Sequence, residues 1–325
     1  MNYKLLGSTG VQVSGLCFGT MSFGGDADEE TSRAMFARCR DAGINFFDCA
    51  NVYNGGRAEE ILGRLAAGQR EELVLTSKAY FPTGPDRNQR GATRKHLRHA
   101  VEASLRRLGT DYLDVYFIHH FDESTALEET LRGLDDLVRD GKILYPAASN
   151  FAAWQVEKAL GISARQGWAR FEVLQPMYNL VKRQAEVEIL PMAQAERLGV
   201  IPYSPLGGGL LSGKYGAGLR PDHGRVVENA MYAKRYSQEW MFGAAGDFSD
   251  FARARGYHPA TLAVAWVAAH PAVTAPIIGA RNVEQLEASL AAGELALSPE
   301  LRAEISAFTP EPPPATDRSE EVTRA

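Results

Sequence analysis

The chain has 325 residues, of which 45% are hydrophobic, and its formal net charge is −5. This length and composition allow a large buried core, and barrels of about 250 residues or more are routinely single domains. Acidic and basic residues nearly balance, and no long basic run with interleaved aromatic residues occurs. These features argue against a nucleic-acid partner.

Neither an export signal nor a membrane span is expected. The first ten residues, MNYKLLGSTG, lack the apolar core of a signal peptide. The most apolar window, residues 262–279, is interrupted by His270-Pro271, which favours a buried helix, a turn and a buried strand. The three cysteines are odd in number and lack C-x-x-C spacing, which is typical of free thiols in a reducing cytosol. We therefore expect a cytoplasmic protein.

In chain order, the sequence first predicts a short β-hairpin around Gly7–Gly10, and then a regular alternation of strands and helices. Short runs rich in Val, Ile, Leu and Phe predict strands at residues 15–19, 44–48, 73–78, 113–119, 143–149, 171–175, 200–204 and 273–279. Longer amphipathic stretches predict helices at residues 29–42, 57–67, 93–108, 125–139, 151–165, 185–198 and 282–292.

The alternation predicts an α/β fold with a parallel sheet. The apolar runs are nearly continuous, as expected for strands covered on both faces. A doubly wound open sheet remains an alternative, but eight repeats favour a (β/α)8 TIM barrel that makes one domain of residues 1–325. Residues 207–245, glycine-rich and then polar and aromatic, predict a long rim loop before the last helices. Residues 309–325 have the composition of a weakly ordered C-terminal tail.

Polar residues end several of the predicted strands. In a (β/α)8 enzyme the active site is built at the C-terminal ends of the strands. The second strand ends on Asp48, the third on Lys78 and the fourth on His119, while Tyr53 follows in the loop after the second. Each residue alone has a structural explanation, such as a capping aspartate or a packed tyrosine. Together, at successive strand ends, they indicate an active site.

These four side chains suit proton donation to an oxygen that gains negative charge. A phenol has a pKa of about 10, and a nearby ammonium is expected to lower it. The Asp48 carboxylate would hold Lys78 in place and keep it charged, and His119 would orient a substrate oxygen. No side chain supplies a hydride, so the set predicts a nicotinamide cofactor.

The histidine pair at 119 and 120 does not indicate a metal site. Adjacent residues of a strand point to opposite faces, so the two are a poor pair of metal ligands and are not expected to serve one site together. We assign the catalytic position to His119 and predict no bound metal. Whether His120 lines the substrate pocket through the following loop stays open.

Beyond these residues, longer motifs resemble the aldo-keto reductase family over nearly the whole chain, from Tyr3 to Thr309. The motifs that carry the resemblance are FFDCANVYNGGRAEEILG, VLTSK, SLRRLGTDYLDVYFIHH, GKILYPAASNF, LQPMYNL, IPYSPLGGGLLSGKY and PIIGARNVEQLEASL. Within the family, the chain is most similar to the branch that contains bacterial aldo/keto reductases and potassium-channel β-subunits.

The resemblance implies a role for each matching residue. It implies a catalytic tetrad of Asp48, Tyr53, Lys78 and His119, with Tyr53 as the general acid. It implies that Ser149, Asn150 and Gln175 hold the nicotinamide carboxamide and that Tyr203 stacks on the ring. The implied contacts to the ribose, pyrophosphate and adenosine are Ser204, Pro205, Leu206, Gly207, Lys214, Gly279, Arg281 and Gln285. Gly19, Thr20 and Met21, at the end of the first strand, complete the predicted cofactor site together with Asp48.

The expected function is NADPH-dependent reduction of an aldehyde or ketone. Arg281 near a 2′-phosphate favours NADP(H), with NADH possible. One alternative is a redox-sensing module that binds the cofactor and turns over slowly, and another is a lyase that forms a Schiff base on Lys78. The partner is a small carbonyl compound, and the rim residues Phe81 and Arg87 suit an aryl aldehyde or a phosphorylated sugar equally well. The sequence does not predict the oligomeric state.

Overall fold

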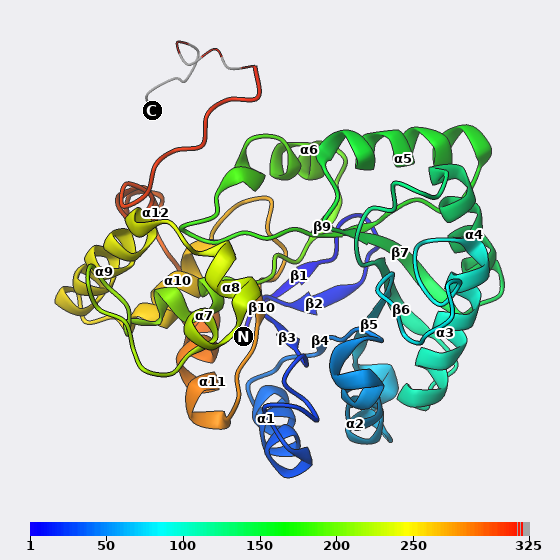
Figure 1. The fold of residues 1–325 in the computed structure, drawn as a ribbon, viewed down its shortest axis with the longest axis horizontal. Helices are drawn as coiled ribbons and strands as arrows, with labels where there is room; N and C mark the ends of the chain where they lie inside the picture. Colours follow the sequence, from blue (N-terminus) through cyan, green and yellow to red (C-terminus); the bar gives the residue numbers. More distant parts are fainter. Residues whose placement is uncertain (317, 319, 321–325) are drawn as a thin grey trace.

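The computed structural model describes residues 1–316, 318 and 320. Within the predicted C-terminal tail, residues 310–314 form no helix or strand, and residues 317, 319 and 321–325 lie outside the described part of the chain. The strands of the central sheet lie inside a ring of helices in Figure 1.

Eight parallel strands form the central sheet in the order β10-β3-β4-β5-β6-β7-β8-β9. Their bounds are β3 Cys17–Gly19, β4 Phe46–Asp48, β5 Val74–Ala79, β6 Leu113–Ile118, β7 Ile143–Ser149, β8 Val173–Gln175, β9 Gly199–Val200 and β10 Ile277–Ile278. The two ends of the sheet are joined, because the Thr274 and Ile277 amides each donate at 2.9 Å to the carbonyls of Val200 and Pro202. The predicted (β/α)8 barrel is therefore confirmed.

The last two strands are shorter than predicted. Prolines at 202 and 276 lie inside the predicted runs 200–204 and 273–279, and a proline has no backbone N–H to donate to a sheet ladder. Beyond the short strands β9 and β10, the two segments remain side by side. Hydrogen bonds from the Thr274 and Ile277 amides to the Val200 and Pro202 carbonyls hold them together. The closing seam is therefore less regular than the β5–β6–β7 part of the sheet.

The N-terminal hairpin is present, as predicted, and it covers one end of the barrel. Strand β1 (Tyr3–Leu5) pairs antiparallel with β2 (Gln12–Ser14). Leu6 and Val13 are fully buried and pack with Cys17 and Phe46 in the apolar cluster that fills the barrel interior. This hairpin closes the end of the barrel opposite the C-terminal ends of the strands and leaves only that second end open.

Helices cover the outside of the sheet. In chain order they are α1 Glu29–Asp41, α2 Arg57–Ala66, α3 Arg94–Leu108, α4 Leu127–Arg139, α5 Ala153–Gln166, α6 Ile189–Ala195, α10 Pro259–Ala268, α11 Val283–Leu290 and α12 Pro299–Ser306. Their starts have local causes, since Asp28, Thr93 and Asn282 each accept a hydrogen bond from a first-turn amide. The predicted helix 185–198 is instead a short 3₁₀ turn, Gln184–Glu186, followed by α6.

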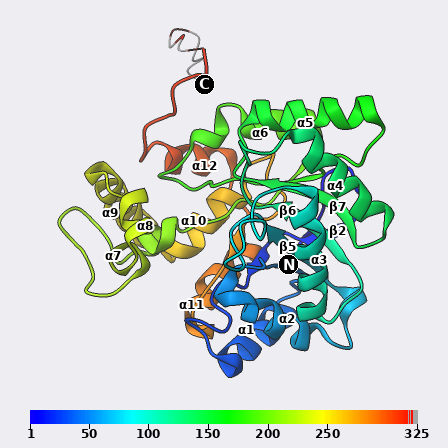
Figure 2. The ribbon, with the colours of Figure 1, turned by 45° about the vertical axis from the view of Figure 1, so that its right-hand side comes forward.

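The prediction of a long rim loop at residues 207–245 is wrong in one respect, because much of this segment is helical. It contains the 3₁₀ segment Gly207–Ser212, α7 (Arg225–Glu228), α8 (Ala230–Arg235) and the start of α9 (Glu239–Ala254). These helices form from packing rather than from an amphipathic repeat, since Val226 and Tyr232 are buried against the rest of the rim. Figures 1 and 2 show α7, α8 and α9 projecting at one side of the barrel.

Two further sequence expectations concern membranes and thiols. Across the described part of the chain, no helix combines the length and the apolar character needed to cross a membrane. Cys17, Cys39 and Cys49 are free thiols, as predicted, and all three are buried.

Candidate active site

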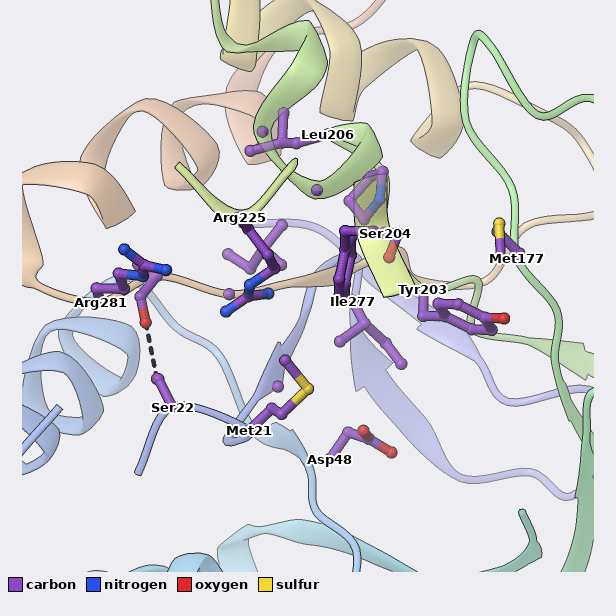
Figure 3. Close-up of a pocket in the computed structure, with 18 of the residues that line it drawn as sticks. Met21, Ser22, Asp48, Met177, Tyr203, Ser204, Leu206, Arg225, Ile277 and Arg281 are labelled. Carbon is purple, nitrogen blue, oxygen red and sulfur yellow. Dashed lines mark hydrogen bonds between the residues drawn. The ribbon is translucent and has the colours of Figure 1, made fainter. Parts of the chain in front are cut away.

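A large cavity opens at the C-terminal ends of the strands, with a volume of about 980 Å³. Figure 3 shows its two ends, with Arg281 and Ser22 on one side and Tyr203 and Met177 on the other. The cavity is therefore elongated along the rim of the barrel. Asp48 lies below it, between the two ends in this view.

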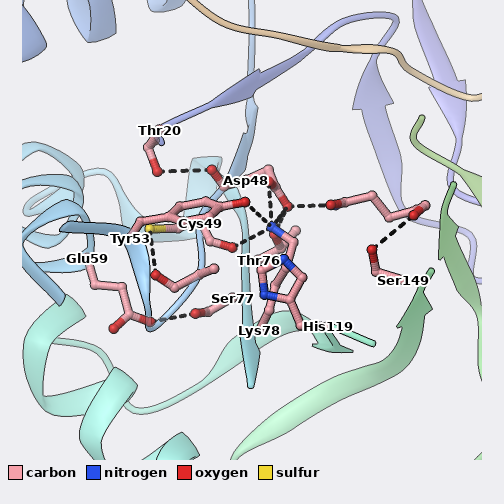
Figure 4. Close-up of polar contacts among 12 residues, drawn as sticks. Thr20, Asp48, Cys49, Tyr53, Glu59, Thr76, Ser77, Lys78, His119 and Ser149 are labelled. Atoms are coloured by element: carbon pink, nitrogen blue, oxygen red, sulfur yellow. Dashed lines mark hydrogen bonds and ion pairs between the residues drawn. The ribbon is translucent and has the colours of Figure 1, made fainter. Parts of the chain in front are cut away.

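A buried ion pair lies at the floor of the cavity, where β4 and β5 run side by side. Lys78 Nζ lies 2.7 Å from Asp48 Oδ1 and 2.6 Å from Oδ2, and it donates to the Cys49 carbonyl at 2.7 Å (Figure 4). The Lys78 side chain is fully buried. Burial disfavours the ammonium and is the largest single effect, but the Asp48 carboxylate, with smaller contributions from Tyr53 and Cys49, raises the pKa of Lys78 overall.

Two other strands, the adjacent β5 and the distant β8, hold the Asp48 carboxylate in place. Thr76 Oγ1 and Gln175 Nε2 donate to Asp48 Oδ1 at 2.7 and 2.9 Å. Gln175 lies at the end of β8, so this contact crosses the barrel interior. Because each partner has a defined position, the Lys78 ammonium is held in one orientation toward the cavity.

Tyr53 is presented by a tight turn after β4. Its hydroxyl lies 3.5 Å from Lys78 Nζ. The turn needs left-handed backbone at Asn54 (φ 50°), Gly55 and Gly56. The Asn54 side chain fixes it, because Nδ2 donates to the carbonyls of Met21 and Phe23 at 3.0 and 2.7 Å.

The predicted lowering of the Tyr53 pKa is not the net result. Burial raises the pKa of Tyr53 to about 12, although the Lys78 charge pulls in the opposite direction. The sequence prediction included the ammonium but not the loss of hydration, and here the loss of hydration is larger. Tyr53 is consequently a protonated phenol at neutral pH, which is the form that can donate a proton.

His119 lies against the aromatic wall of the cavity. Its ring centroid is 4.9 Å from that of Phe81 and 6.1 Å from that of Tyr53. Burial, with the Lys78 charge nearby, lowers the pKa of His119 to about 2. His119 is therefore a neutral imidazole, and its Nδ1 atom is buried without a hydrogen-bond partner among the described residues.

Both histidines at the end of β6 line the cavity. The question that the sequence left open for His120 is thereby answered: the strand ends at Ile118, the alternation of faces ends with it, and both side chains reach the cavity. His120 turns its Nδ1 atom to the Phe121 carbonyl at 2.8 Å. It also packs on Tyr80, at 5.3 Å between ring centroids.

A chain of amide and hydroxyl groups continues from Gln175 along the cavity. Ser149 Oγ donates to the Gln175 carbonyl at 3.0 Å, and Asn150 Nδ2 donates to Ser149 Oγ at 3.1 Å. The Tyr203 hydroxyl donates to Asn150 Oδ1 at 2.7 Å. Asn150 and Ser204 both have left-handed backbone, at φ 58°, which marks the two turns as conformationally constrained.

The far end of the cavity carries a charged cluster. Arg281 Nε lies 3.0 Å from Asp26 Oδ2, and Arg281 Nη1 lies 3.7 Å from Glu228 Oε2. Arg225 Nη2 lies 3.8 Å from the same Asp26 oxygen. Asp26 follows β3, whereas Glu228 and Arg225 belong to α7, so these ion pairs connect the loop after β3 with α7.

Most of the residues predicted from the sequence meet in this one cavity. Those that line it are Gly19, Met21, Asp48, Tyr53, His119, Ser149, Asn150, Gln175, Tyr203, Ser204, Pro205, Leu206, Lys214, Gly279, Arg281 and Gln285. Lys78 lies beneath the lining and contacts Asp48 and Tyr53. Two predicted residues do not reach the cavity. Thr20 is buried and donates to the Asp48 carbonyl at 3.0 Å, and Gly207 forms a buried turn at φ 59°.

Sequence reasoning missed a further group of lining residues, which lie in the helical insert (residues 207–245), at the start of α10 and in α11. They include Gly224, Arg225, Met231, Tyr232, Arg235, His258 and Glu284. The only sequence pattern that pointed to these lining residues was the number of basic and aromatic residues in the insert. It was not decisive because an insert without a repeat does not reveal which side chains face inward. No group of side chains suited to a metal ion occurs within the described residues.

Comparisons with known proteins agree with this geometry. The model of the aldo/keto reductase family matches residues 15–309. A Bacillus subtilis protein named uncharacterized oxidoreductase YrpG is 39% identical, covering 96% of this chain and 97% of its own length. A probable voltage-gated potassium channel subunit beta of Arabidopsis thaliana is 36% identical over 90% of this chain and 91% of its own. Norsolorinic acid reductase of Emericella nidulans is 36% identical over 93% and 79%. These matches confirm the predicted family and support an oxidoreductase that acts on carbonyl compounds. The chain belongs to the aldo/keto reductase family.

Proposed function

We propose that this protein reduces an aldehyde or ketone to an alcohol with NADPH, and that Tyr53 is the general acid. The observation that carries the proposal is the position of the Tyr53 phenol, at the cavity and 3.5 Å from a buried ammonium. A phenol with a raised pKa gives up its proton only to a strongly basic oxygen, such as the one formed as a carbonyl is reduced.

The cavity fits a nicotinamide dinucleotide. Its volume of about 980 Å³ suits a large elongated ligand. Ser149, Asn150 and Gln175 offer hydroxyl and amide groups to the carboxamide, and Tyr203 offers a ring face. Lys214 and the backbone from Ser204 to Leu206 line the same cavity and would offer an ammonium and amide groups to the phosphates. When bound, such a cofactor supplies the hydride that no side chain can supply.

The residues of the chain then perform the proton chemistry. Tyr53 donates its phenolic proton to the substrate oxygen, and the Lys78 ammonium stabilises the phenolate that remains. Asp48 keeps Lys78 charged and positioned throughout. Neutral His119 would orient the substrate oxygen by donating a hydrogen bond from its ring N–H group. Because the pKa of His119 is lowered, the ring is not an imidazolium that would compete with Tyr53 in giving a proton to the substrate.

The basic residues at the far end of the cavity favour NADPH over NADH. Arg281 and Arg225 bring two guanidinium groups to the place expected for a 2′-phosphate. Asp26 and Glu228 balance these charges in the structure described here. A 2′-phosphate would have to replace carboxylate contacts, so the preference is expected to be moderate.

The relatives support a second candidate, a cofactor-binding module that turns over slowly. A potassium channel subunit beta is as similar to this chain as a reductase is. Such a module keeps the fold and the cavity, so the rate of turnover separates the two candidates. The Schiff-base alternative has less support, because Lys78 is fully buried, is charged and does not line the cavity.

The first experiment follows NADPH oxidation at 340 nm with 4-nitrobenzaldehyde, in the wild type and in Tyr53→Phe. Loss of a general acid lowers kcat by about 10²- to 10⁴-fold, while NADPH binding should remain. Tyr257→Phe is the matched control, because the hydroxyl of this tyrosine makes no hydrogen bond to the described residues and the residue lies outside the cavity lining. Binding of NADPH without turnover in the wild type would favour the module, and absence of binding would contradict both candidates.

A further inference from the structure

One guanidinium that faces the cavity has no anionic partner. Arg235, the last residue of α8, lines the cavity and is half-buried. Its side chain donates a hydrogen bond only to the Met231 sulfur, at 3.8 Å, and forms no ion pair with any described carboxylate. A guanidinium has five N–H donors, so most of the hydrogen-bonding capacity of Arg235 is unused.

A second cation lies close to Arg235. Lys182 Nζ is 5.9 Å from the Tyr236 ring centroid, and Arg235 Cζ is 5.1 Å from that of Tyr232. These two rings are stacked at 6.5 Å, so both cations lie against one aromatic pair. Burial lowers the pKa of Lys182, and the Arg235 charge lowers it further. Among the described residues Lys182 has no carboxylate partner either. Two unbalanced positive charges side by side are unfavourable unless an anion joins them.

The arginines at the far end of the cavity differ from Arg235 in having carboxylate partners. There, Arg281 and Arg225 are balanced by Asp26 and Glu228. The end near Tyr203 has no such carboxylates among the described residues that line the cavity. Arg235 therefore differs from Arg281 and Arg225, the other two arginines that line the cavity, because none of its guanidinium nitrogens has a carboxylate partner among the described residues.

Arg235 belongs to the reacting end rather than to the adenosine end. Its charge acts on the Tyr203 phenol, whose pKa it lowers against the larger effect of burial. Tyr203 bonds Asn150, and Asn150 in turn donates to the His119 carbonyl at 2.9 Å. In Figure 3, Tyr203 and Met177 lie at the end of the cavity away from Arg281. The ring pair that Arg235 contacts is also tied to the turn at Ser204, because Asn179 Nδ2 donates to the Tyr236 hydroxyl at 3.2 Å and to the Ser204 carbonyl at 2.9 Å.

We propose that Arg235, supported by Lys182, binds an anionic group of the carbonyl substrate. This inference rests on the proposed function and narrows its substrate class to aldehydes or ketones that carry a carboxylate or a phosphate. A guanidinium binds either group with two parallel hydrogen bonds. The pyrophosphate of the cofactor has the same chemistry and is the other possible source of the anion.

The test compares two aldehydes of similar shape, 4-carboxybenzaldehyde and its uncharged methyl ester. The measured quantity is the ratio of their kcat/KM values in the wild type, in Arg235→Gln and in the control Lys234→Gln. Lys234 is the preceding residue, and its side chain is exposed and makes no hydrogen bond or ion pair to the described residues. We expect kcat/KM for the carboxylated aldehyde, divided by kcat/KM for its methyl ester, to fall about tenfold or more in Arg235→Gln, because a charge-assisted hydrogen bond is lost. Lys234→Gln should keep the wild-type ratio.

A ratio that is the same in Arg235→Gln and wild type overturns the proposal. If that unchanged ratio comes with weaker NADPH binding, the anion bound by Arg235 is the cofactor pyrophosphate. If Arg235→Gln does not fold, Lys182→Gln provides a second test. It should lower the same ratio by a smaller factor. If the wild type reduces neither aldehyde, the proposed function fails. The anion site can then still be tested by measuring the affinities of benzoate and benzamide for the NADPH-loaded protein by calorimetry. Benzoate should bind more tightly than benzamide, and equal affinities would contradict the proposal.

Discussion

The buried ammonium of Lys78 sets the chemical properties of the groups around it. It is held by Asp48 and by the Cys49 carbonyl, and it reaches toward the Tyr53 hydroxyl. A buried charge is tolerated only when it is paired and hydrogen-bonded, and both conditions are met here. The same charge disfavours a second cation nearby, which contributes to the neutral state of His119.

The pH dependence of the reaction should reflect this neutral histidine. With its pKa lowered to about 2, His119 does not titrate near its ordinary value of 6.5. The pKa of Tyr53, about 12, keeps the phenol protonated. We therefore expect kcat/KM for an uncharged aldehyde to be flat between about pH 6 and pH 9. An inflection near pH 6.5 in the wild type that is absent from His119→Gln would contradict this expectation.

The same shift predicts an effect on stability. Below pH 6.5 the unfolded chain protonates His119, whereas the folded protein does not until about pH 2. The free energy of unfolding should therefore fall as the pH drops below 6.5. His119→Gln removes this contribution, so urea unfolding at pH 7.5 and pH 5 should show a smaller loss in the variant.

At the scale of secondary-structure elements, close backbone contact determines how the outer helices pack. A Cβ atom on Gly63 of α2 would lie 2.4 Å from the Leu108 carbonyl oxygen at the end of α3. That atom belongs to backbone and cannot move aside by a rotamer change. The contact matters for the site because α2 starts directly after the Tyr53 turn and α3 follows the strand that carries Lys78.

A glycine-to-alanine pair tests this contact. Gly63→Ala should lower the free energy of unfolding by about 1–3 kcal/mol, the usual effect of an overpacked core. Gly161→Ala, in the interior of α5 with no atom near the new methyl group, should instead raise it by up to about 1 kcal/mol. Urea denaturation measures both variants. Equal effects of the two substitutions would show that α2 and α3 can separate at little cost.

At the scale of the whole molecule, the two ends of the barrel have separate tasks. The hairpin buries Leu6 and Val13 in the barrel interior at one end, and the cavity occupies the other. Stability and chemistry are therefore located at opposite ends of the strands, as is usual for this architecture.

This separation predicts a variant that weakens the fold without changing the chemistry. Leu6→Ala should lower the free energy of unfolding by about 2–5 kcal/mol, because the side chain is fully buried and leaves a cavity. The kcat of the folded protein at 25 °C should stay within about twofold of the wild type, since Leu6 contacts none of the proposed catalytic groups. Chemical denaturation and steady-state kinetics on one preparation measure both quantities. A large fall in kcat would mean that the hairpin also positions the site.

Local sequence patterns were sufficient for the regular parts of the molecule. Apolar runs of the right length placed all eight strands, because most residues of these strands are buried on both faces. Strand ends also indicated Asp48, Lys78 and His119, because the carboxyl ends of parallel strands meet at one edge of a barrel. The helical insert was missed, since α7 and α8 are too short for periodicity and depend on packing of Val226 and Tyr232.

The sequence by itself determined the family, the order of the barrel elements and the identity of the four proposed catalytic side chains. These properties follow from hydrophobic periodicity and from motifs that are local in the chain. Only the tertiary structure decided the net pKa of Tyr53, the shared location of His119 and His120, and the unbalanced charge of Arg235. Each of these depends on burial and on distances between residues far apart in the chain, because desolvation and Coulomb interactions act through space.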